Sequence, residues 1–396
     1  MSRGFSQVMT VRLASLVLCG FLMGAAHAEP SGLPFGTARE WTANLDSAHL
    51  VNVTQDGAAL CNSVAFSQVP GHRELFLGRV KENTNDNKCS GNNWALALFQ
   101  MDWTKMDLHF VRYILKPPFT VPGDGRVINS AYDPYAIEFK GELWVAFECA
   151  ASGSVSSCIG PVDLEKGMDN GRISLPASGG PKSNSDSWVV SASDPKLLSF
   201  REHLYLYWTV IRSDEHGWHD AAVRGAELIK DKRSKDERSR KSLWLKDSGG
   251  RAVRSNDNKM TVGTWTPAAN DPLSDSVADV FGLYPEGNSI IASAGLGGHG
   301  NATGESCLTP GGTSQGCYRL TIARASDPLA RDAFSSVDIH VIGFPYNPQE
   351  YSRVVQSPDG SLFVMGMYIE PPAKYAAQYK GHALPRGLMI YPISVK

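Results

Sequence analysis

Hydrophobic and polar residues alternate on both sides of a glycine turn between residues 130 and 150. A polar start, Tyr132-Asp133-Pro134, leads into an apolar segment that ends at Lys140-Gly141. The segment after the turn alternates two sets of residues, Leu143, Val145 and Phe147 in one and Trp144, Ala146 and Glu148 in the other. Alternation with a period of two around a glycine turn predicts a β-hairpin.

The same hairpin pattern recurs along the chain, about every 60–85 residues. Each copy begins with a polar residue, continues as an apolar strand, turns, and returns as a second apolar strand. In order, the five polar starting positions are Asn62, Asp133, Asp194, Asp279 and Arg353. A repeat of this length indicates a repetitive architecture rather than unrelated domains.

Each interval between copies holds further strand-like runs, for example residues 94–99, 109–115, 318–323 and 337–342. Four strands per unit, repeated radially, are typical of a propeller blade. We therefore expect an all-β fold, a five-bladed β-propeller of four-stranded antiparallel blades around a central channel. The last unit has one further strand, residues 388–395, so residues 49–53 at the start of the chain are expected to complete it and close the ring.

Long connections are predicted on one face of this propeller, and short turns on the other. Long loops over one end of a rigid scaffold are a usual place for binding sites. Aromatic residues can stack on sugar rings, although they can equally fix the loops in place. The residues expected to bind substrate at this face are Asn62, Arg353, Trp188, Trp218, Trp265, Tyr351 and His299.

Three of the five starting positions are aspartates, and the first residues of the innermost strands converge at the mouth of the channel. Like charges held close together raise the proton affinity of at least one carboxyl, which prepares an acid and a base. Asp133, Asp194 and Asp279 are therefore the candidate catalytic residues. The alternative is that each Asp starts a strand by accepting backbone hydrogen bonds, and that Arg353 only forms a salt bridge with one of them.

The pattern Asp-Pro, a hydrophobic strand, a turn and an aromatic-rich second strand resembles that of five-bladed propeller glycoside hydrolases, the arabinanase/β-xylosidase and invertase/levansucrase groups. The resemblance covers residues 45–396 and implies an Asp in the first blade, an Asp in the next and a Glu in a third. Asp133 and Asp194 match the aspartates, in blades two and three here, whereas Asn62 stands where the first Asp is expected. The general acid would then be Asp279 or a loop residue, Asp186 or Glu350.

The N-terminus and the cysteines indicate export. Arg3 and Arg12 precede an apolar run that ends in Ala-His-Ala at residue 28, the pattern of a cleaved signal peptide. Residues 29–396 then form a single domain. Six of the seven cysteines remain, and an even number in an exported chain favours disulfides. The expected pairs are Cys61–Cys89, Cys149–Cys158 and Cys307–Cys317, the last two within long loops.

Composition limits the possible partners. The chain has 396 residues and a formal net charge of −2, which gives no electrostatic reason to expect a nucleic-acid partner. No Cys-x-x-Cys spacing occurs, so no metal ligands are assigned; the resemblance alone implies a possible structural calcium ion. We expect a periplasmic or extracellular glycosidase that acts on a furanose- or pentose-containing glycan with inversion. The alternative is a non-catalytic propeller that binds glycan or protein through the same face.

Overall fold

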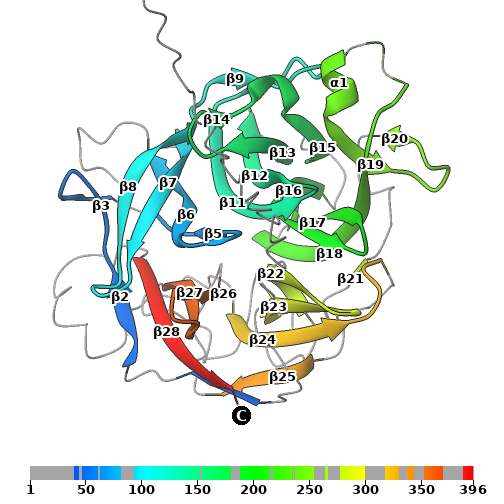
Figure 1. Cartoon of the computed structure of the whole chain (residues 1–396). Helices are drawn as coiled ribbons and strands as arrows, with labels where there is room; N and C mark the ends of the chain where they lie inside the picture. Colours follow the sequence, from blue (N-terminus) through cyan, green and yellow to red (C-terminus); the bar gives the residue numbers. More distant parts are fainter. Residues whose placement is uncertain are drawn as a thin grey trace, which may run out of the picture.

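The structure is a computed structural model of the whole chain. It describes residues 40–43, 47–60, 63–81, 93–151, 154–179, 188–214, 217–233, 235, 237–253, 264–265, 277–298, 317–329, 337–342, 352–368 and 387–395. Within these ranges the chain is nearly all β (Figure 1), with a short α-helix, α1 (Glu237–Lys241), and a 3-10 turn, η2 (Asn170–Arg172). The predicted all-β class is confirmed.

Antiparallel strand pairs occur at all five predicted hairpins, although the first strand of the first one begins only at Ser67, after the polar start predicted at Asn62. They are β5 (Ser67–Val69) with β6 (His72–Lys81), β11 (Ser130–Phe139) with β12 (Glu142–Ala151), β16 (Trp188–Phe200) with β17 (His203–Asp214), β22 (Val277–Glu286) with β23 (Ser289–Gly298), and β26 (Arg353–Gln356) with β27 (Leu362–Tyr368). The turns use left-handed backbone, for example φ 76° at Gly141 and 92° at Gly360. Glycine takes this conformation without steric cost, which is why these turns could be recognised in the sequence.

Further strands extend each hairpin outwards. The first group adds β7 (Trp94–Asp102) and β8 (Asp107–Leu115), and the second adds β13 (Ser154–Asp163), β14 (Gly167–Met168) and β15 (Ser174–Ser178). The third group adds β18 (Gly217–Lys230), β19 (Leu243–Lys246), β20 (Ala252–Val253) and β21 (Thr264–Trp265). The fourth adds β24 (Cys317–Ala325) and β25 (Val337–Ile342). The strand-like runs predicted at residues 94–99, 109–115, 318–323 and 337–342 all lie within these strands. A small separate sheet pairs β9 (Phe119–Thr120) with β10 (Val127–Ile128).

The N-terminal strands join the last hairpin to the rest of the fold. β28 (Gly387–Val395) pairs with β27 on one side and with β2 (His49–Val51) on the other. β1 (Glu40–Ala43) also pairs with β28, and runs parallel to β25 of the preceding group. After β2 the chain enters the first group, where β3 (Val53–Gln55) pairs with β8 and with β4 (Ala58–Ala59).

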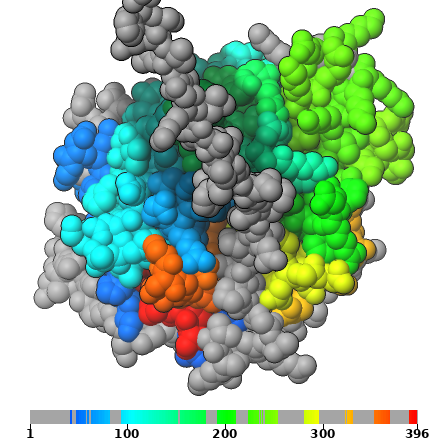
Figure 2. Space-filling view, viewed as in Figure 1, coloured from blue at the N-terminus to red at the C-terminus, as the bar shows by residue number. Residues whose placement is uncertain are grey.

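Neighbouring strand groups share hydrophobic cores, so the groups are packed in sequence order. One core unites Phe76 and Phe99 of the first group with Phe363 and Ile390 of the last. Side chains also bond across this junction, since Gln68 donates to the carbonyl of Gln356 at 2.7 Å. Figure 2 agrees, because the orange atoms of the last hairpin lie against the blue and cyan atoms of the first group.

One predicted disulfide is confirmed. Cys149 on β12 and Cys158 on β13 are bonded, with their Cα atoms 5.8 Å apart and both side chains fully buried. The prediction that this bond fixes a long loop is wrong, because β13 already begins at Ser154 and the disulfide links two neighbouring strands. The side chains of the other predicted pairs, Cys61–Cys89 and Cys307–Cys317, lie outside the described residues, as does the predicted signal peptide at residues 1–28. Across the ranges described, no helix is long and apolar enough to cross a membrane.

Candidate functional site

Two of the three predicted catalytic aspartates lie at matching bulges in neighbouring strand groups. The strand pairing skips Asp133-Pro134 in β11 and Asp194-Pro195 in β16. Both aspartates have left-handed backbone, with φ 53° at Asp133 and 50° at Asp194. This conformation is uncommon for residues other than glycine but is tolerated by Asp. A bulge changes the direction of a side chain, so each Asp-Pro pair directs a carboxylate out of its strand.

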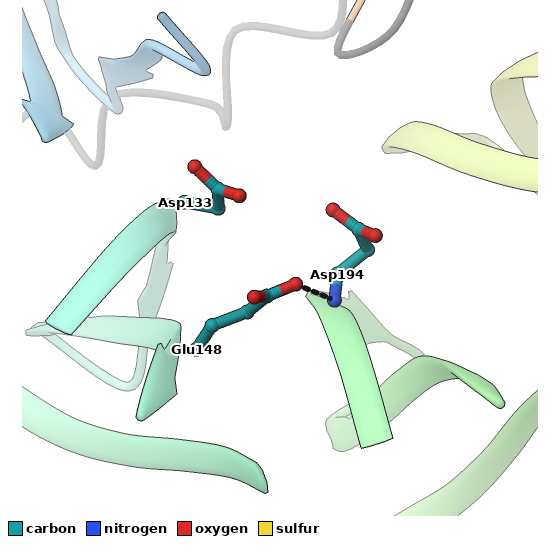
Figure 3. Close-up of side chains that lie close together, drawn as sticks. All are labelled: Asp133, Glu148 and Asp194. Atoms are coloured by element: carbon teal, nitrogen blue, oxygen red, sulfur yellow. Dashed lines mark hydrogen bonds between the residues drawn. The ribbon is translucent and has the colours of Figure 1, made fainter. Parts of the chain in front are cut away.

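A third carboxylate, that of Glu148, completes the group. Glu148 lies on β12, directly across from Tyr132. Figure 3 shows Asp133, Glu148 and Asp194 turned towards one another, and one oxygen atom from each carboxylate lies within 4.8 Å of the others. The Glu148 Oε1 atom accepts a hydrogen bond of 2.6 Å from the Asp194 backbone N–H. That bond links the second strand of one hairpin to the bulge of the next, and it fixes the Glu148 carboxylate relative to the Asp194 backbone.

The environment of Glu148 favours its protonated form. Only 5% of the residue is exposed. Burial raises the pKa of Glu148 well above its ordinary value, and the negative charges of Asp194 and then Asp133 raise it further. Burial disfavours an ionised carboxyl and so do neighbouring carboxylates. Glu148 is therefore suited to hold a proton at a pH where ordinary carboxyl groups have lost theirs.

Asp133 has an ionic partner instead. Its Oδ1 atom accepts a hydrogen bond of 2.9 Å from the Arg79 guanidinium, which β6 supplies from the first strand group. The Arg79 guanidinium also lies over the Trp94 ring, 5.0 Å from its centre. With Asp133 only 1% exposed, this is a buried ion pair. A buried carboxylate without such a partner would be strongly destabilising.

The first strand group contributes no carboxylate at the corresponding bulge. Ala65 has the same left-handed backbone, with φ 60°, and precedes the paired residue Ser67 by two positions. Asp133 and Asp194 precede Tyr135 and Lys196 in the same way. The residue that corresponds to the aspartates is therefore Ala65. The sequence analysis placed that position at Asn62, which is outside the described residues.

Arg353 is buried within the fold rather than exposed at the surface. It is only 2% exposed, and its guanidinium donates to the carbonyls of Phe281 at 2.9 Å and Pro134 at 2.7 Å. The guanidinium also lies over the Tyr135 ring, and burial lowers its pKa. The Tyr135 hydroxyl in turn donates to the Leu283 carbonyl and accepts from the Leu283 N–H. These contacts tie three different hairpins together, so a direct role of Arg353 in substrate binding stays a prediction.

The remaining predicted residues cannot be compared with the site in the same way. Asp279 lies in β22, Trp188 in β16, Trp218 in β18 and Trp265 in β21, but their side chains are outside the described part of the chain. Asn62, Tyr351 and His299, and the alternative acids Asp186 and Glu350, are outside it altogether. Sequence reasoning missed Glu148 because it examined only the starts of first strands. The signal that could have found it is its place opposite Tyr132, next to the Asp-Pro motif.

The carboxylates of Asp133, Glu148 and Asp194 do not fit a calcium site. Calcium prefers about six to eight oxygen ligands, and among the described residues the three carboxylates form a possible oxygen-ligand group. Three cationic side chains already compensate them, however. Arg79 bonds Asp133, the buried Lys196 donates to the Asp194 carbonyl at 2.7 Å, and the charge of Arg353 interacts with both aspartates. We therefore derive no step through a metal, and a calcium ion elsewhere in the chain stays a prediction.

Comparison with known proteins finds distant structural similarity. No protein-family sequence model matches the chain, and no curated protein sequence matches it. The chain is similar to an endo-arabinase from Bacteroides thetaiotaomicron VPI-5482, at 10% identity and a TM-score of 0.45, covering 88% of this chain and 98% of that one. It is also similar to an α-L-arabinofuranosidase from Lactobacillus brevis, at 10% identity and a TM-score of 0.47, covering 84% of this chain and 91% of that one. A third similar structure is the catalytic domain of a Coprinopsis cinerea GH62 α-L-arabinofuranosidase, at 11% identity and a TM-score of 0.43, covering 90% of this chain and 98% of that one. Likeness at this level does not by itself assign a reaction or a substrate to the chain.

Proposed function

We propose that this protein is an exported glycoside hydrolase that acts on a glycan containing furanose or pentose sugars. The observation that carries the proposal is the convergence of Asp133, Glu148 and Asp194 from neighbouring hairpins, with Glu148 in surroundings that favour its protonated form. Cleavage of a glycosidic bond needs one carboxyl that donates a proton and another that stays ionised near the anomeric carbon. Neighbouring carboxyls with unequal surroundings meet both needs.

In this proposal Glu148 is the general acid. Its proton passes to the leaving oxygen as the glycosidic bond breaks. Asp194 is the carboxylate that faces the anomeric carbon, because it is the most exposed of the three. Asp133 does not contact the reacting atoms; its charge, held by Arg79, keeps the proton on Glu148 until the leaving oxygen takes it. The third predicted catalytic residue, Asp279, is not needed for this assignment.

The proposed architecture is a closed five-bladed propeller, formed by residues 29–396. The five hairpins and their outer strands support it, as do the shared cores between neighbouring groups. Pairing of β2 with β28 supports closure by the N-terminal strand. Export to the periplasm or the cell exterior is supported by the signal-peptide pattern and by the Cys149–Cys158 disulfide, since disulfides persist in oxidising compartments.

A second candidate function is glycan binding without catalysis. It is favoured by one observation, that the first hairpin has Ala65 where the next two have aspartates. A propeller that lost a catalytic carboxylate could keep a sugar site formed by the same loops. The two candidates differ in turnover, because only the first requires a protonated carboxyl beside an ionised one.

The experiment that tests the proposal is turnover of a panel of oligosaccharides and methyl glycosides, furanosides and pyranosides whose leaving oxygen needs a proton, by wild type and by Glu148→Gln. Loss of a general acid reduces the rate by about 10²–10⁴-fold, and we expect kcat to fall in that range for substrates with poor leaving groups. Glu138→Gln is the matched control, because Glu138 is an exposed carboxyl on the same hairpin. Equal turnover by wild type and Glu148→Gln would remove Glu148 from the mechanism. Binding of oligosaccharides without any turnover would support the second candidate.

A further inference from the structure

We propose that residues 230–241, the basic segment, form a second glycan contact that binds an acidic polysaccharide, a polymer whose sugars carry carboxylate groups. The segment runs from the end of β18 to the end of α1. It starts beside the hairpin turn of β16 and β17, whereas Asp194 lies at the bulge within β16. The basic segment is therefore separate from the carboxylates, and only the choice of a polysaccharide as its partner rests on the proposed function.

The basic segment concentrates positive charge in a chain that is otherwise acidic. Its sequence has seven Lys/Arg against three Asp/Glu, whereas the whole chain has a formal net charge of −2. The cations of the segment whose side chains the structure describes are all exposed: Lys230, Lys232, Arg233, Lys235, Arg240 and Lys241. Clustered charge of one sign raises the local concentration of partners with the opposite charge.

Most of this charge is not compensated within the segment. Of its anions, Glu237 pairs with Lys241 at 2.7 Å. Asp231 accepts a hydrogen bond of 3.1 Å from the Arg233 backbone N–H, so its carboxylate serves the local turn. The following cations have no ion-pair partner among the residues that the structure describes: Lys232, Arg233, Lys235 and Arg240. An excess of positive charge therefore faces the solvent.

The fold holds the basic segment in place at the outer edge of its strand group. In the strand order of this sheet, β19 follows β18 on the side away from β16, and Figure 1 shows α1 at the rim of the molecule. Directly after α1, the Ser242 hydroxyl donates to the Arg172 carbonyl at 3.2 Å. The Ser174 hydroxyl donates to the Leu243 carbonyl at 2.6 Å. Both ends of the segment are thus tied to strands, which lowers the entropy cost of binding.

The chemistry of the basic segment favours a polymer with repeated charges over other anionic partners. Residues 230–241 include no apolar and no aromatic side chain. A helix that lies on a membrane needs an apolar face that enters the lipid, and single-stranded nucleic acid is bound by aromatic side chains that stack on its bases. Exposed ion pairs are weak one by one, so a chain of carboxylates that contacts several cations at once gains most from this arrangement.

This contact has a consequence for the proposed function. A protein held on an acidic polysaccharide meets the other sugars of the same polymer at a raised effective concentration. The basic segment then selects the polymer, and the carboxylate cluster selects the bond that is cleaved.

The test is equilibrium binding of the protein to immobilised polygalacturonate and alginate, with immobilised dextran as the neutral control. We expect binding to the two acidic polymers and none to dextran. Because salt screens exposed charges, the affinity should fall by at least about tenfold between about 0.01 M and about 0.15 M salt. The binding is measured without any substrate turnover.

Matched variants locate the binding. One variant removes three charges from the segment, with the substitutions Lys232→Gln, Lys235→Gln and Arg240→Gln. The control variant removes three charges at exposed positions elsewhere, with the substitutions Lys105→Gln, Lys116→Gln and Lys166→Gln. We expect the first variant to lose about tenfold or more in affinity for polygalacturonate at low salt, as several weak ion pairs are lost together. The control should bind nearly as well as wild type, and both should unfold as wild type does.

The outcomes separate this inference from the proposed function. Equal affinity of the two variants, equal binding to dextran, or no binding to either acidic polymer would overturn the inference and leave the proposed hydrolase untouched. Binding to vesicles of phosphatidylglycerol without binding to the acidic polymers would overturn it in favour of a membrane surface. Binding to polygalacturonate through the segment, by a protein that cleaves no glycoside, would support the inference and overturn the proposed hydrolase.

Discussion

Replacing Glu148 by Gln should stabilise the protein at neutral pH, and the stabilisation should grow as the pH rises. Glu148 is 5% exposed, and burial with the charges of Asp194 and Asp133 raises its pKa well above the ordinary value of 4.5. In the unfolded chain the same carboxyl titrates near its ordinary value. Between the two pKa values the folded state therefore binds more protons than the unfolded state, so the stability of the wild type falls as the pH rises through this interval.

The size of the effect follows from proton linkage. Each pH unit above about 4.5, up to the folded-state pKa, costs the wild type about 1.4 kcal/mol. Gln is nearly the same size, cannot ionise, and can still accept the hydrogen bond from the Asp194 N–H with its side-chain oxygen. For a domain of this length, 1.4 kcal/mol corresponds to a Tm change of roughly 2 °C. The difference in Tm should therefore be smallest near pH 4.5 and widen by roughly 2 °C per pH unit.

The measurement is urea and thermal unfolding of wild type and Glu148→Gln between pH 4.5 and pH 8, in steps of about half a pH unit. Glu138→Gln, at an exposed position of the same hairpin, is the control and should give a difference that does not change with pH. If Glu148→Gln is less stable than wild type by the same amount at every pH, the carboxyl is not held protonated by the fold. Its assignment as a proton donor would then be refuted.

Three further predictions concern the contacts around the site. Arg79→Met should cost about 3–5 kcal/mol in urea unfolding, because it leaves the buried Asp133 carboxylate without its ionic partner; adding Asp133→Asn to it should recover much of that loss, and no recovery would contradict the ion-pair explanation. Tyr135→Phe should lower the free energy of unfolding by about 1–3 kcal/mol, because the buried N–H and carbonyl of Leu283 lose their hydrogen-bond partner. A loss much smaller than about 1 kcal/mol would contradict a stabilising role of these hydrogen bonds. Replacing Cys149 and Cys158 by Ala should lower the free energy of unfolding by about 2–4 kcal/mol. A reductant should lower the Tm of wild type but not that of the variant. An equal fall in both would show that the reductant does not act through this disulfide.

The hairpins could be predicted well from the sequence because they depend on local signals. The turn at Lys140-Gly141 needs left-handed backbone, and both residues have it, with φ 53° and 76°. The strands on either side are each ten residues long and rich in apolar residues. Asp133 and Asp194 could also be selected, because each precedes a proline, but the prediction that they begin their strands is wrong, since both lie at bulges inside β11 and β16. Both signals involve residues close together in the chain, which a repeat comparison detects directly.

The third carboxylate and the ionic partner could not be selected in that way. Residues 144–149 of β12 are all buried, so alternation does not distinguish the side of the strand on which Glu148 lies. Arg79 reaches Asp133 from a strand 54 positions earlier, and a single sequence contains no sign of that contact. The loop predicted before Cys158 was wrong because the local sequence is ambiguous. A run of Ser, Gly and Val is compatible both with a loop and with the first residues of β13.

The sequence by itself therefore determined the repeating hairpin, its glycine turns, two Asp-Pro bulges and one neighbouring disulfide. Only the tertiary structure decided which charges meet. It brought Glu148 together with Asp133 and Asp194, paired Asp133 with Arg79, and buried Arg353 against the Pro134 carbonyl. The physical reason is that burial and the distance between charges set the proton affinity of a carboxyl, and both depend on how separate hairpins pack rather than on the order of residues within any one of them.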